Sequence, residues 1–179
     1  MTVDLRLMEW IADHRSAPLT AIARTLMAGS DGRVLGVVLI VVFALAIAVE
    51  QVAALGATIT AAATASAVAT ALKDLVDRPR PPADLALVTA QGSSMPSTVA
   101  ALLCAGTIAL VLTFRWPSPL VRRVMAGLVG CLALLVSAAM LYLGAHWLTD
   151  VLAGWLIGAT VASAAVALFA RITGAHIAL

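Results

Sequence analysis

Long apolar stretches alternate with short polar segments along most of this chain. Five of these stretches are long enough to predict membrane-spanning helices. They cover residues 34–49, 52–72, about 96–114, about 121–143 and about 146–170. At about 1.5 Å per residue, these lengths fit a hydrocarbon layer of roughly 30 Å, although the first is somewhat short. The pattern therefore predicts an all-α integral membrane bundle of about five transmembrane helices.

Residues 4–28 have a different pattern, in which charged and apolar positions are interspersed. In the second half of this region, apolar residues recur with the spacing of one helical face. The Ser16-Ala17-Pro18 segment divides the region into two short helices. Amphipathic helices of this kind lie in the membrane interface more readily than they span the bilayer. We therefore predict an interfacial segment over 4–28 and a transmembrane bundle over 34–171, in a single membrane domain of residues 1–179.

The composition agrees with a membrane protein and argues against a nucleic-acid partner. The chain has 179 residues, of which 63% are hydrophobic and 11% are charged. A soluble domain of this length could not bury that much apolar surface. The net charge is only +2, and the basic residues form no stripe or patch that would follow a phosphate backbone. Membrane lipids are the expected surroundings, and the sequence is compatible with a homo-oligomer without requiring one.

Arginine positions suggest which side of the membrane carries the polar segments. With five spans, the N-terminal region and residues 73–94 share one face, and the turn at 115–123 lies on the other. That turn contains three arginines and no acidic residue, which favours the cytoplasmic side. Four arginines within the first 33 residues argue for the opposite orientation. On balance we expect a protein of the plasma membrane with its polar segments on the extracytoplasmic face.

The first polar segment whose side chains could bind a ligand covers residues 73–81. It reads Lys-Asp-Leu-Val-Asp-Arg-Pro-Arg-Pro. Lys73 is the only lysine in the chain, and Arg78 and Arg80 lie among prolines that force an extended loop. Lysine supplies a point charge and arginine supplies a planar two-pronged donor, a combination that holds a phosphate group well. The alternative is a lysine that extends to the membrane surface beside arginines that favour lipid head groups.

The second polar segment, residues 94–98, contains Ser97 at the expected start of the third span. Backbone N–H groups and hydroxyls at a helix N-terminus form a site for an anion. A serine in this position also caps a helix without any ligand, which is the simpler interpretation. This segment alone is weak support for a phosphate site.

The third polar segment, residues 142–150, reads Tyr-Leu-Gly-Ala-His-Trp-Leu-Thr-Asp. His146 and Asp150 are four residues apart, so on one helix they would share a face. A carboxylate that accepts a proton from one imidazole nitrogen leaves the other nitrogen free to attack an electrophile. The alternative is a buried pair that only joins helices, but an ionisable pair within a membrane more often has a function.

Taken in order, these segments resemble the motifs of the type-2 phosphatidic acid phosphatase family. Its members are integral membrane lipid phosphatases that share their core with vanadium-dependent haloperoxidases. The family's first motif is a lysine, six arbitrary residues and Arg-Pro, which Lys73 and Arg80-Pro81 match. Its third motif ends in a histidine followed four residues later by an aspartate, and residues 142–150 reproduce its common form. The resemblance covers about residues 20–165.

This resemblance implies a histidine nucleophile and a phosphohistidine intermediate. His146 would attack phosphorus, and Asp150 would orient its imidazole. Phosphoryl transfer depends mainly on positioning and charge neutralisation, so we expect neither a metal nor a cofactor. The resemblance implies that Lys73, Arg80 and Ser97 bind the phosphate group. Arg78, a further cation in the same loop as Arg80, is a fourth candidate ligand.

Two positions depart from the family's motifs. The second motif reads Pro-Ser-Gly-His, and its histidine protonates the leaving oxygen, but here Val99 stands at that position. The third motif opens with Ser-Arg, and its arginine binds phosphate, but here Met140 replaces it. Losing a general acid costs about 10²–10⁴-fold in rate when the leaving group is poor. Because a diphosphate releases phosphate and needs less protonation, surviving hydrolysis should favour lipid diphosphates such as polyprenyl diphosphate.

These observations lead to one principal hypothesis and two alternatives. The principal hypothesis is a lipid-phosphate phosphohydrolase that acts on a polyprenyl or glycerolipid phosphate or diphosphate, as the retained His146 and Asp150 suggest. The first alternative is a catalytically impaired relative that binds anionic lipid as a carrier, a scaffold or a partner of another membrane enzyme. The lost acid and arginine favour that alternative. The second is altered chemistry on the same site, such as phosphoryl transfer or departure of diphosphate from an allylic lipid.

Overall fold

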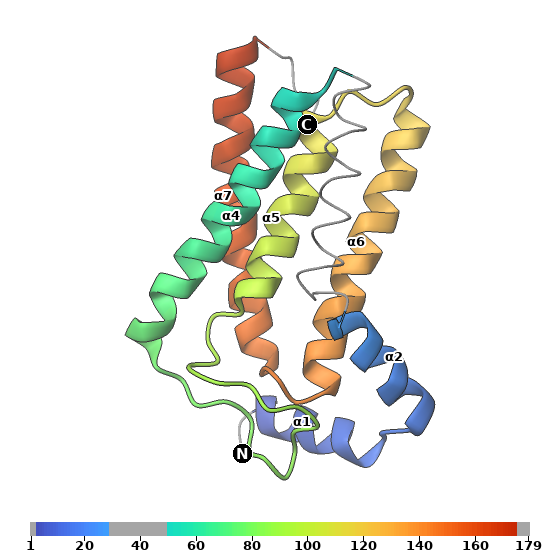
Figure 1. The fold of residues 1–179 in the computed structure, drawn as a ribbon, viewed down its shortest axis with the longest axis vertical. Helices are drawn as coiled ribbons and strands as arrows, with labels where there is room; N and C mark the ends of the chain where they lie inside the picture. The colour runs from blue at the N-terminus through green and yellow to red at the C-terminus, as the bar shows by residue number, and fades with distance from the viewer. Residues whose placement is uncertain (1–2, 29–49, 175–179) are drawn as a thin grey trace.

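The computed structural model describes residues 3–28 and 50–174, which form helices and loops without any strand. Four long helices run side by side, and two short helices lie across one end of them (Figure 1). In chain order the helices are α1 Val3–Asp13, α2 Ala17–Ala28, α4 Val52–Val76, α5 Thr98–Thr113, α6 Pro119–Tyr142 and α7 Leu148–Thr173. The predicted all-α fold is confirmed.

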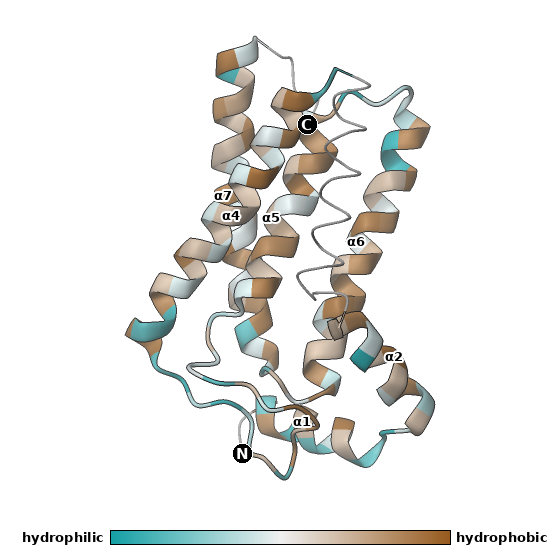
Figure 2. Ribbon diagram, in the orientation of Figure 1, coloured by the Kyte–Doolittle hydropathy of each residue, from teal (hydrophilic) through white to brown (hydrophobic). Residues whose placement is uncertain are grey.

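Three of the described helices, α4, α6 and α7, are long and apolar enough to cross a membrane, and α5 is a shorter apolar helix. Figure 2 shows apolar residues along these helices and polar residues gathered in the connections at their ends. The predicted span at 34–49 lies outside the described residues. The total of five spans therefore stays a prediction, as does the division into a single domain.

Small residues allow the central helices to approach closely. Alanines recur at every fourth position, on one face each of α4 and α5, and pack together with residues of α7. This buried cluster contains Ala61, Ala65, Ala69, Ala101, Ala105, Ala109, Ala162 and Val166. Among the described helices α5 is central, because it contacts α4, α6 and α7, whereas α4 contacts α5 and α7.

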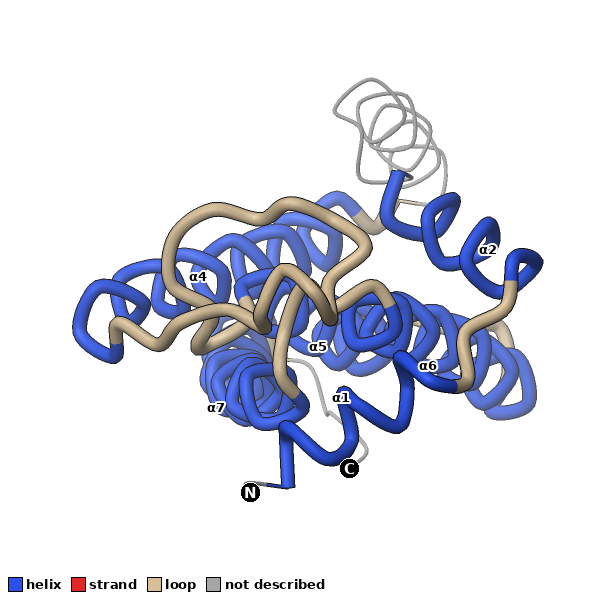
Figure 3. Tube along the Cα trace, turned by 90° about the horizontal axis from the view of Figure 1, so that it is seen from below, coloured by secondary structure: helices blue, strands red, loops and turns tan. Residues whose placement is uncertain are grey.

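The two short N-terminal helices pack against the end of the bundle that also carries the loop between α4 and α5 (Figure 3). The predicted break between them is confirmed, since α1 ends at Asp13 and α2 begins at Ala17. Arg15, in this break, donates to the backbone carbonyl of Leu85 at 2.7 Å and to that of Tyr142 at 2.9 Å. One arginine thus joins the N-terminal region to both the α4–α5 loop and the end of α6.

Part of the apolar face of α2 packs against the bundle, and part of it is exposed. Ala23, Leu26 and Met27 pack against residues of the end of α6. Leu19 and Ile22 are 51% and 56% exposed, so much of their apolar surface is left uncovered by the described residues. This arrangement suits a helix in the membrane interface, a location that stays a prediction.

Two glycines of α7 bring its backbone into contact with α5. A Cβ atom on Gly158 would lie 2.5 Å from the carbonyl oxygen of Ala101 and 2.8 Å from Cys104 Cβ. A Cβ atom on Gly154 would lie 2.5 Å from the carbonyl oxygen of Ser97. These contacts hold the start of α5 against the first turns of α7, which is where the polar segments meet.

Gly158→Ala should lower the free energy of unfolding by about 1–3 kcal/mol, because an added methyl group must displace the α5 backbone. Thermal unfolding in detergent micelles measures the change. The matched control is Gly127→Ala on α6, where an added Cβ meets no atom of the described residues within 4 Å. The control should be neutral or slightly stabilising, since alanine favours the helix more than glycine does. Equal stability of the two variants would contradict the close contact between α5 and α7.

Candidate active site

The loop between α4 and α5, residues 77–97, is named here the polar loop. It begins where α4 ends, with Asp77 in the left-handed region at φ 43°. The loop then folds back on itself: the Arg78 N–H donates to Ser93 Oγ at 3.0 Å, and the Ser94 N–H donates to the Arg78 carbonyl at 2.8 Å. The buried Ser94 hydroxyl also donates to the Pro79 carbonyl at 3.0 Å. Residues 78–80 are thereby held beside residues 93–94.

Backbone contacts attach the polar loop to the turn between α6 and α7. The Leu87 N–H donates to the Leu143 carbonyl at 2.8 Å. Gly144 has φ +72°, and a Cβ there would lie 2.7 Å from the Leu85 carbonyl oxygen and 2.7 Å from Ala86 Cα. The glycine of the Tyr-Leu-Gly sequence therefore serves both a left-handed turn and a close backbone approach. These contacts hold the polar loop against the third polar segment.

Lys73 and Arg80 lie side by side over the carbonyl oxygens of the polar loop. Lys73 Nζ donates to the Ser93 carbonyl at 2.6 Å, and Arg80 Nη2 reaches the same oxygen at 3.4 Å. Arg80 Nη1 donates to the Ala145 carbonyl at 2.6 Å and lies 3.5 Å from His146 Nε2. Burial lowers the pKa of Arg80 and Asp150 partly raises it again, so the guanidinium keeps its charge at neutral pH. Neither cation forms an ion pair with a described acidic residue, so the two together favour an anion beside them.

His146 does not lie on the same helix as Asp150, so the prediction of a shared helical face is wrong. Helix α7 begins at Leu148 with Trp147 as its N-cap, and His146 belongs to the preceding turn. The reason is local: Asp150 Oδ2 accepts a hydrogen bond from the Trp147 N–H at 2.8 Å and thereby closes the helix start. The turn still brings the two side chains together.

The His146 imidazole and the Asp150 carboxylate face each other in a buried position. His146 Nδ1 lies 3.5 Å from Asp150 Oδ2, and the two side chains are 8% and 0% exposed. Nδ1 has no hydrogen-bond partner among the described residues. Catalytic hydrogen bonds are often long before substrate binds, so this geometry suits a pair that tightens during reaction. Nε2, the opposite nitrogen, is the one that lies beside Arg80.

Arg78 occupies a different place from Lys73 and Arg80. Its Nη1 donates to Asp150 Oδ1 at 2.7 Å, and its Nη2 donates to Asp4 Oδ2 at 2.6 Å. Both ends of the guanidinium are therefore engaged by buried carboxylates. Its role as a phosphate ligand stays a prediction. Asp4 was not identified from the sequence, where its only signal is an acidic residue in the first turn of an amphipathic helix.

Ser97 caps helix α5, as the simpler interpretation of its position predicts. Its Oγ accepts from the Ala100 N–H at 3.3 Å and donates weakly to Met140 Sδ at 3.8 Å. Ser97 is fully buried, and its contact with phosphate stays a prediction. Met140 is 1% exposed and packs with Ala100, Ala145 and Val151, so an apolar cluster fills the neighbourhood of Ser97.

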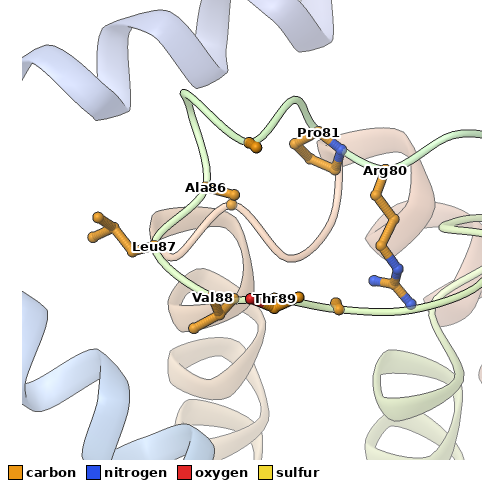
Figure 4. A pocket seen from close by; sticks show the side chains of 9 residues that line it. Arg80, Pro81, Ala86, Leu87, Val88 and Thr89 are labelled. Atoms are coloured by element: carbon orange, nitrogen blue, oxygen red, sulfur yellow. The ribbon is translucent and has the colours of Figure 1, made fainter.

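An open pocket of about 460 Å³ adjoins the site at Arg80, which lines it together with Gly144 and residues of the polar loop. Arg80 is on one side of it, and Leu87 and Val88 of the polar loop are on another (Figure 4). Val99, at the position of the family's general acid, is 36% exposed at the start of α5. The site therefore combines a cationic pair, a histidine–aspartate pair and an accessible pocket, without a second histidine at the expected position.

The chain matches the model of one protein family over most of its length. The model of the PAP2 superfamily matches residues 51–173, a range that holds all three polar segments. The chain belongs to the PAP2 superfamily, the family of type-2 phosphatidic acid phosphatases. A search of curated proteins gives no significant match.

Two solved structures share the PAP2 fold of this chain. The first is a transmembrane PAP2-type phosphatidylglycerolphosphate phosphatase from Bacillus subtilis, with a TM-score of 0.75 and 22% identity over 94% of this chain and 85% of that one. The second is LpxE from Aquifex aeolicus, with a TM-score of 0.72 and 23% identity over 93% of this chain and 96% of that one. At these identities the comparisons support the fold.

Arg78→Met should lower the free energy of unfolding by roughly 3 kcal/mol, because two buried carboxylates would lose their cation. Unfolding of the purified protein in detergent at neutral pH measures this loss. The control is Arg6→Met, which removes the same charge from an exposed position on α1. A loss no larger than that of the control would mean that Arg78 is not structurally required.

The pH dependence of this stabilisation follows from Asp4. Burial raises the pKa of Asp4, but hydrogen bonds from Thr149 and the pairing with Arg78 outweigh it and bring the pKa below its ordinary value. The carboxylate therefore stabilises the fold fully above the ordinary aspartate pKa. Its contribution is lost as the pH falls through the lowered value.

Proposed function

We propose that this PAP2 protein is a membrane lipid-phosphate phosphohydrolase that uses His146 as its nucleophile. The observation that carries the proposal is the position of His146 between a cation and a carboxylate. Its Nε2 lies 3.5 Å from Arg80 Nη1, and its Nδ1 lies 3.5 Å from Asp150 Oδ2. One imidazole nitrogen thus faces a place where a phosphate group would bind, and the other faces a group that stabilises positive charge on the ring.

Lys73 and Arg80 are the groups that would hold the phosphoryl oxygens. Apart from the contact of Arg80 with His146, their partners among the described residues are backbone carbonyls, and each side chain keeps at least one further N–H donor. Neutralising the phosphoryl charge while holding it in line with Nε2 is the main requirement of phosphoryl transfer. Ser97 could contribute only after a change in its capping contacts, since its hydroxyl is buried.

In the proposed first step, His146 Nε2 forms a bond to phosphorus, and the bond from phosphorus to the leaving oxygen breaks. Asp150 stabilises the imidazolium that results. A water molecule then attacks the phosphohistidine, which releases phosphate and restores the imidazole. Besides the nucleophile, the described residues supply charge stabilisation and orientation.

The substitutions at Val99 and Met140 determine the expected substrate class. With valine at the position of the general acid, the leaving oxygen receives no proton from that side chain. With methionine buried at the arginine position, one cationic ligand is lost. A lipid diphosphate, whose leaving group is a phosphate, is affected least. We therefore propose polyprenyl or other lipid diphosphates as preferred substrates, reached from the extracytoplasmic face of the plasma membrane.

Hydrolysis of a panel of lipid monophosphates and diphosphates by the purified protein tests this function. We expect phosphate release from diphosphates at least about 10²-fold faster than from monoesters. His146→Ala should abolish release, and the matched control His14→Ala, at an exposed position on the N-terminal region, should not. Binding of these lipids without release, unchanged in His146→Ala, would instead indicate a non-catalytic lipid-binding protein.

Val99→His should restore part of the missing acid function. We expect monoester hydrolysis to rise by about 10–10²-fold, with little change for diphosphates, because only the poor leaving group needs the proton. The measurement is kcat for both substrate classes. Val99→Gln introduces a polar side chain without an acidic proton and should give no gain. A gain from both variants would show that polarity, rather than proton donation, limits the reaction.

A further inference from the structure

Asp4 is a buried acid in a helix that lies outside the PAP2 match. Its side chain is 6% exposed. Its Oδ2 accepts hydrogen bonds from Arg78 Nη2 and Thr149 Oγ1, both at 2.6 Å, and its Oδ1 accepts from the Thr149 N–H at 3.1 Å. A carboxylate is kept charged in a buried position only where such donors surround it. By contrast Asp13, at the other end of α1, is exposed.

The guanidinium of Arg78 connects Asp4 to Asp150. Nη2 donates to Asp4, and Nη1 donates to Asp150 Oδ1 at 2.7 Å and to Thr149 Oγ1 at 2.5 Å. The guanidinium carbon also lies 5.4 Å from the ring centre of Trp147. Because the guanidinium is planar and rigid, it cannot rotate without losing one of the two carboxylates.

The orientation of Asp150 depends on this guanidinium. Oδ1 is held by Arg78, which leaves Oδ2 to accept from the Trp147 N–H and to face His146 Nδ1. If Arg78 turned, the carboxylate would turn with it, and Oδ2 would move relative to the imidazole. A continuous series of contacts thus runs from Asp4 through Arg78 and Asp150 to His146.

We propose that Asp4 is a positioning residue for the histidine nucleophile, so that helix α1 forms part of the catalytic unit. Asp4 holds one end of Arg78, and Arg78 in turn holds Asp150 toward His146. Because Arg78 is shared with Asp4, it neutralises Asp150 less than it would if it were paired with Asp150 alone. Asp150 therefore keeps more negative charge with which to attract the imidazole proton. The kinetic consequences rest on the proposed function, whereas the effect on the His146 ring does not.

Steady-state kinetics of Asp4→Asn on a lipid diphosphate give the first test. We expect kcat to fall by about 10-fold, the scale on which groups behind a reacting side chain act, with KM unchanged because Asp4 does not contact Lys73 or Arg80. Asp4→Glu should recover part of the loss. Asp13→Asn, the matched control on the same helix, should behave as the unmodified protein. A higher KM with unchanged kcat, or a kcat equal to that of the control, would overturn the proposal.

Combining substitutions separates positioning from a merely structural role. If Asp4 acts through Asp150, adding Asp4→Asn to Asp150→Asn should cost no further activity, because the carboxylate that Asp4 positions is already absent. A structural role would lower activity in both backgrounds by the same factor. That additive result would overturn the proposal.

Nuclear magnetic resonance of isotope-labelled histidine in detergent micelles gives a test that needs no turnover. With His146 neutral, Asp150 should hold the proton on Nδ1, and Asp4→Asn should give a mixture of the two tautomers. The ring signal that disappears in His146→Ala is assigned to His146. The ring signal of His14 should be unchanged by Asp4→Asn. If the unmodified protein hydrolysed no lipid phosphate, the proposed function would fail while this change could still be seen. An unchanged His146 signal would overturn the role of Asp4 whatever the activity.

Discussion

Two buried carboxylates, Asp4 and Asp150, share the guanidinium of Arg78, and the arrangement of the polar end of the bundle depends on this interaction. In a low-dielectric environment an unpaired carboxylate would be very unfavourable. One cation that satisfies both therefore ties three separate parts of the chain together: α1, the polar loop and the start of α7. Asp150 also closes the first turn of α7 through the Trp147 N–H, so the same side chain serves the helix and the histidine.

This pairing divides the basic residues of the first motif into two groups. Arg78 is held by carboxylates, and its charge is already compensated. Lys73 and Arg80 are held by neutral backbone carbonyls, so their charges remain available to an anion. The cationic pair and the histidine consequently form the part of the site that would meet a phosphate group. Asp150 faces Nδ1 of the histidine, and Arg78 joins Asp150 to Asp4; in our proposal these groups orient the imidazole.

The departures from the PAP2 motifs affect the same small region. Met140 is buried in an apolar cluster beside Ser97, while Val99 is partly exposed at the first turn of α5. The position that would protonate the leaving group and one position that would bind phosphate are therefore apolar, whereas the residues around the histidine keep their polar character. Such an asymmetric site suits a substrate that brings its own good leaving group, as a diphosphate does.

The amino-acid sequence by itself determined the helical membrane fold, the break near Ser16 and the spacing of Lys73, Arg80, His146 and Asp150. These features follow from hydropathy, proline positions and local motifs, which act over a few residues. Only the tertiary structure decided that α5 is central among the described helices and that His146 precedes α7. It also decided that Arg78 pairs with carboxylates instead of standing with Lys73 and Arg80 as a third unpaired cation. It alone joined Asp4 to the site, because that contact spans 145 residues between Asp4 and Thr149, and no local pattern encodes it. Which charges are paired is set by the proximity of distant segments and by the need to satisfy every buried carboxylate.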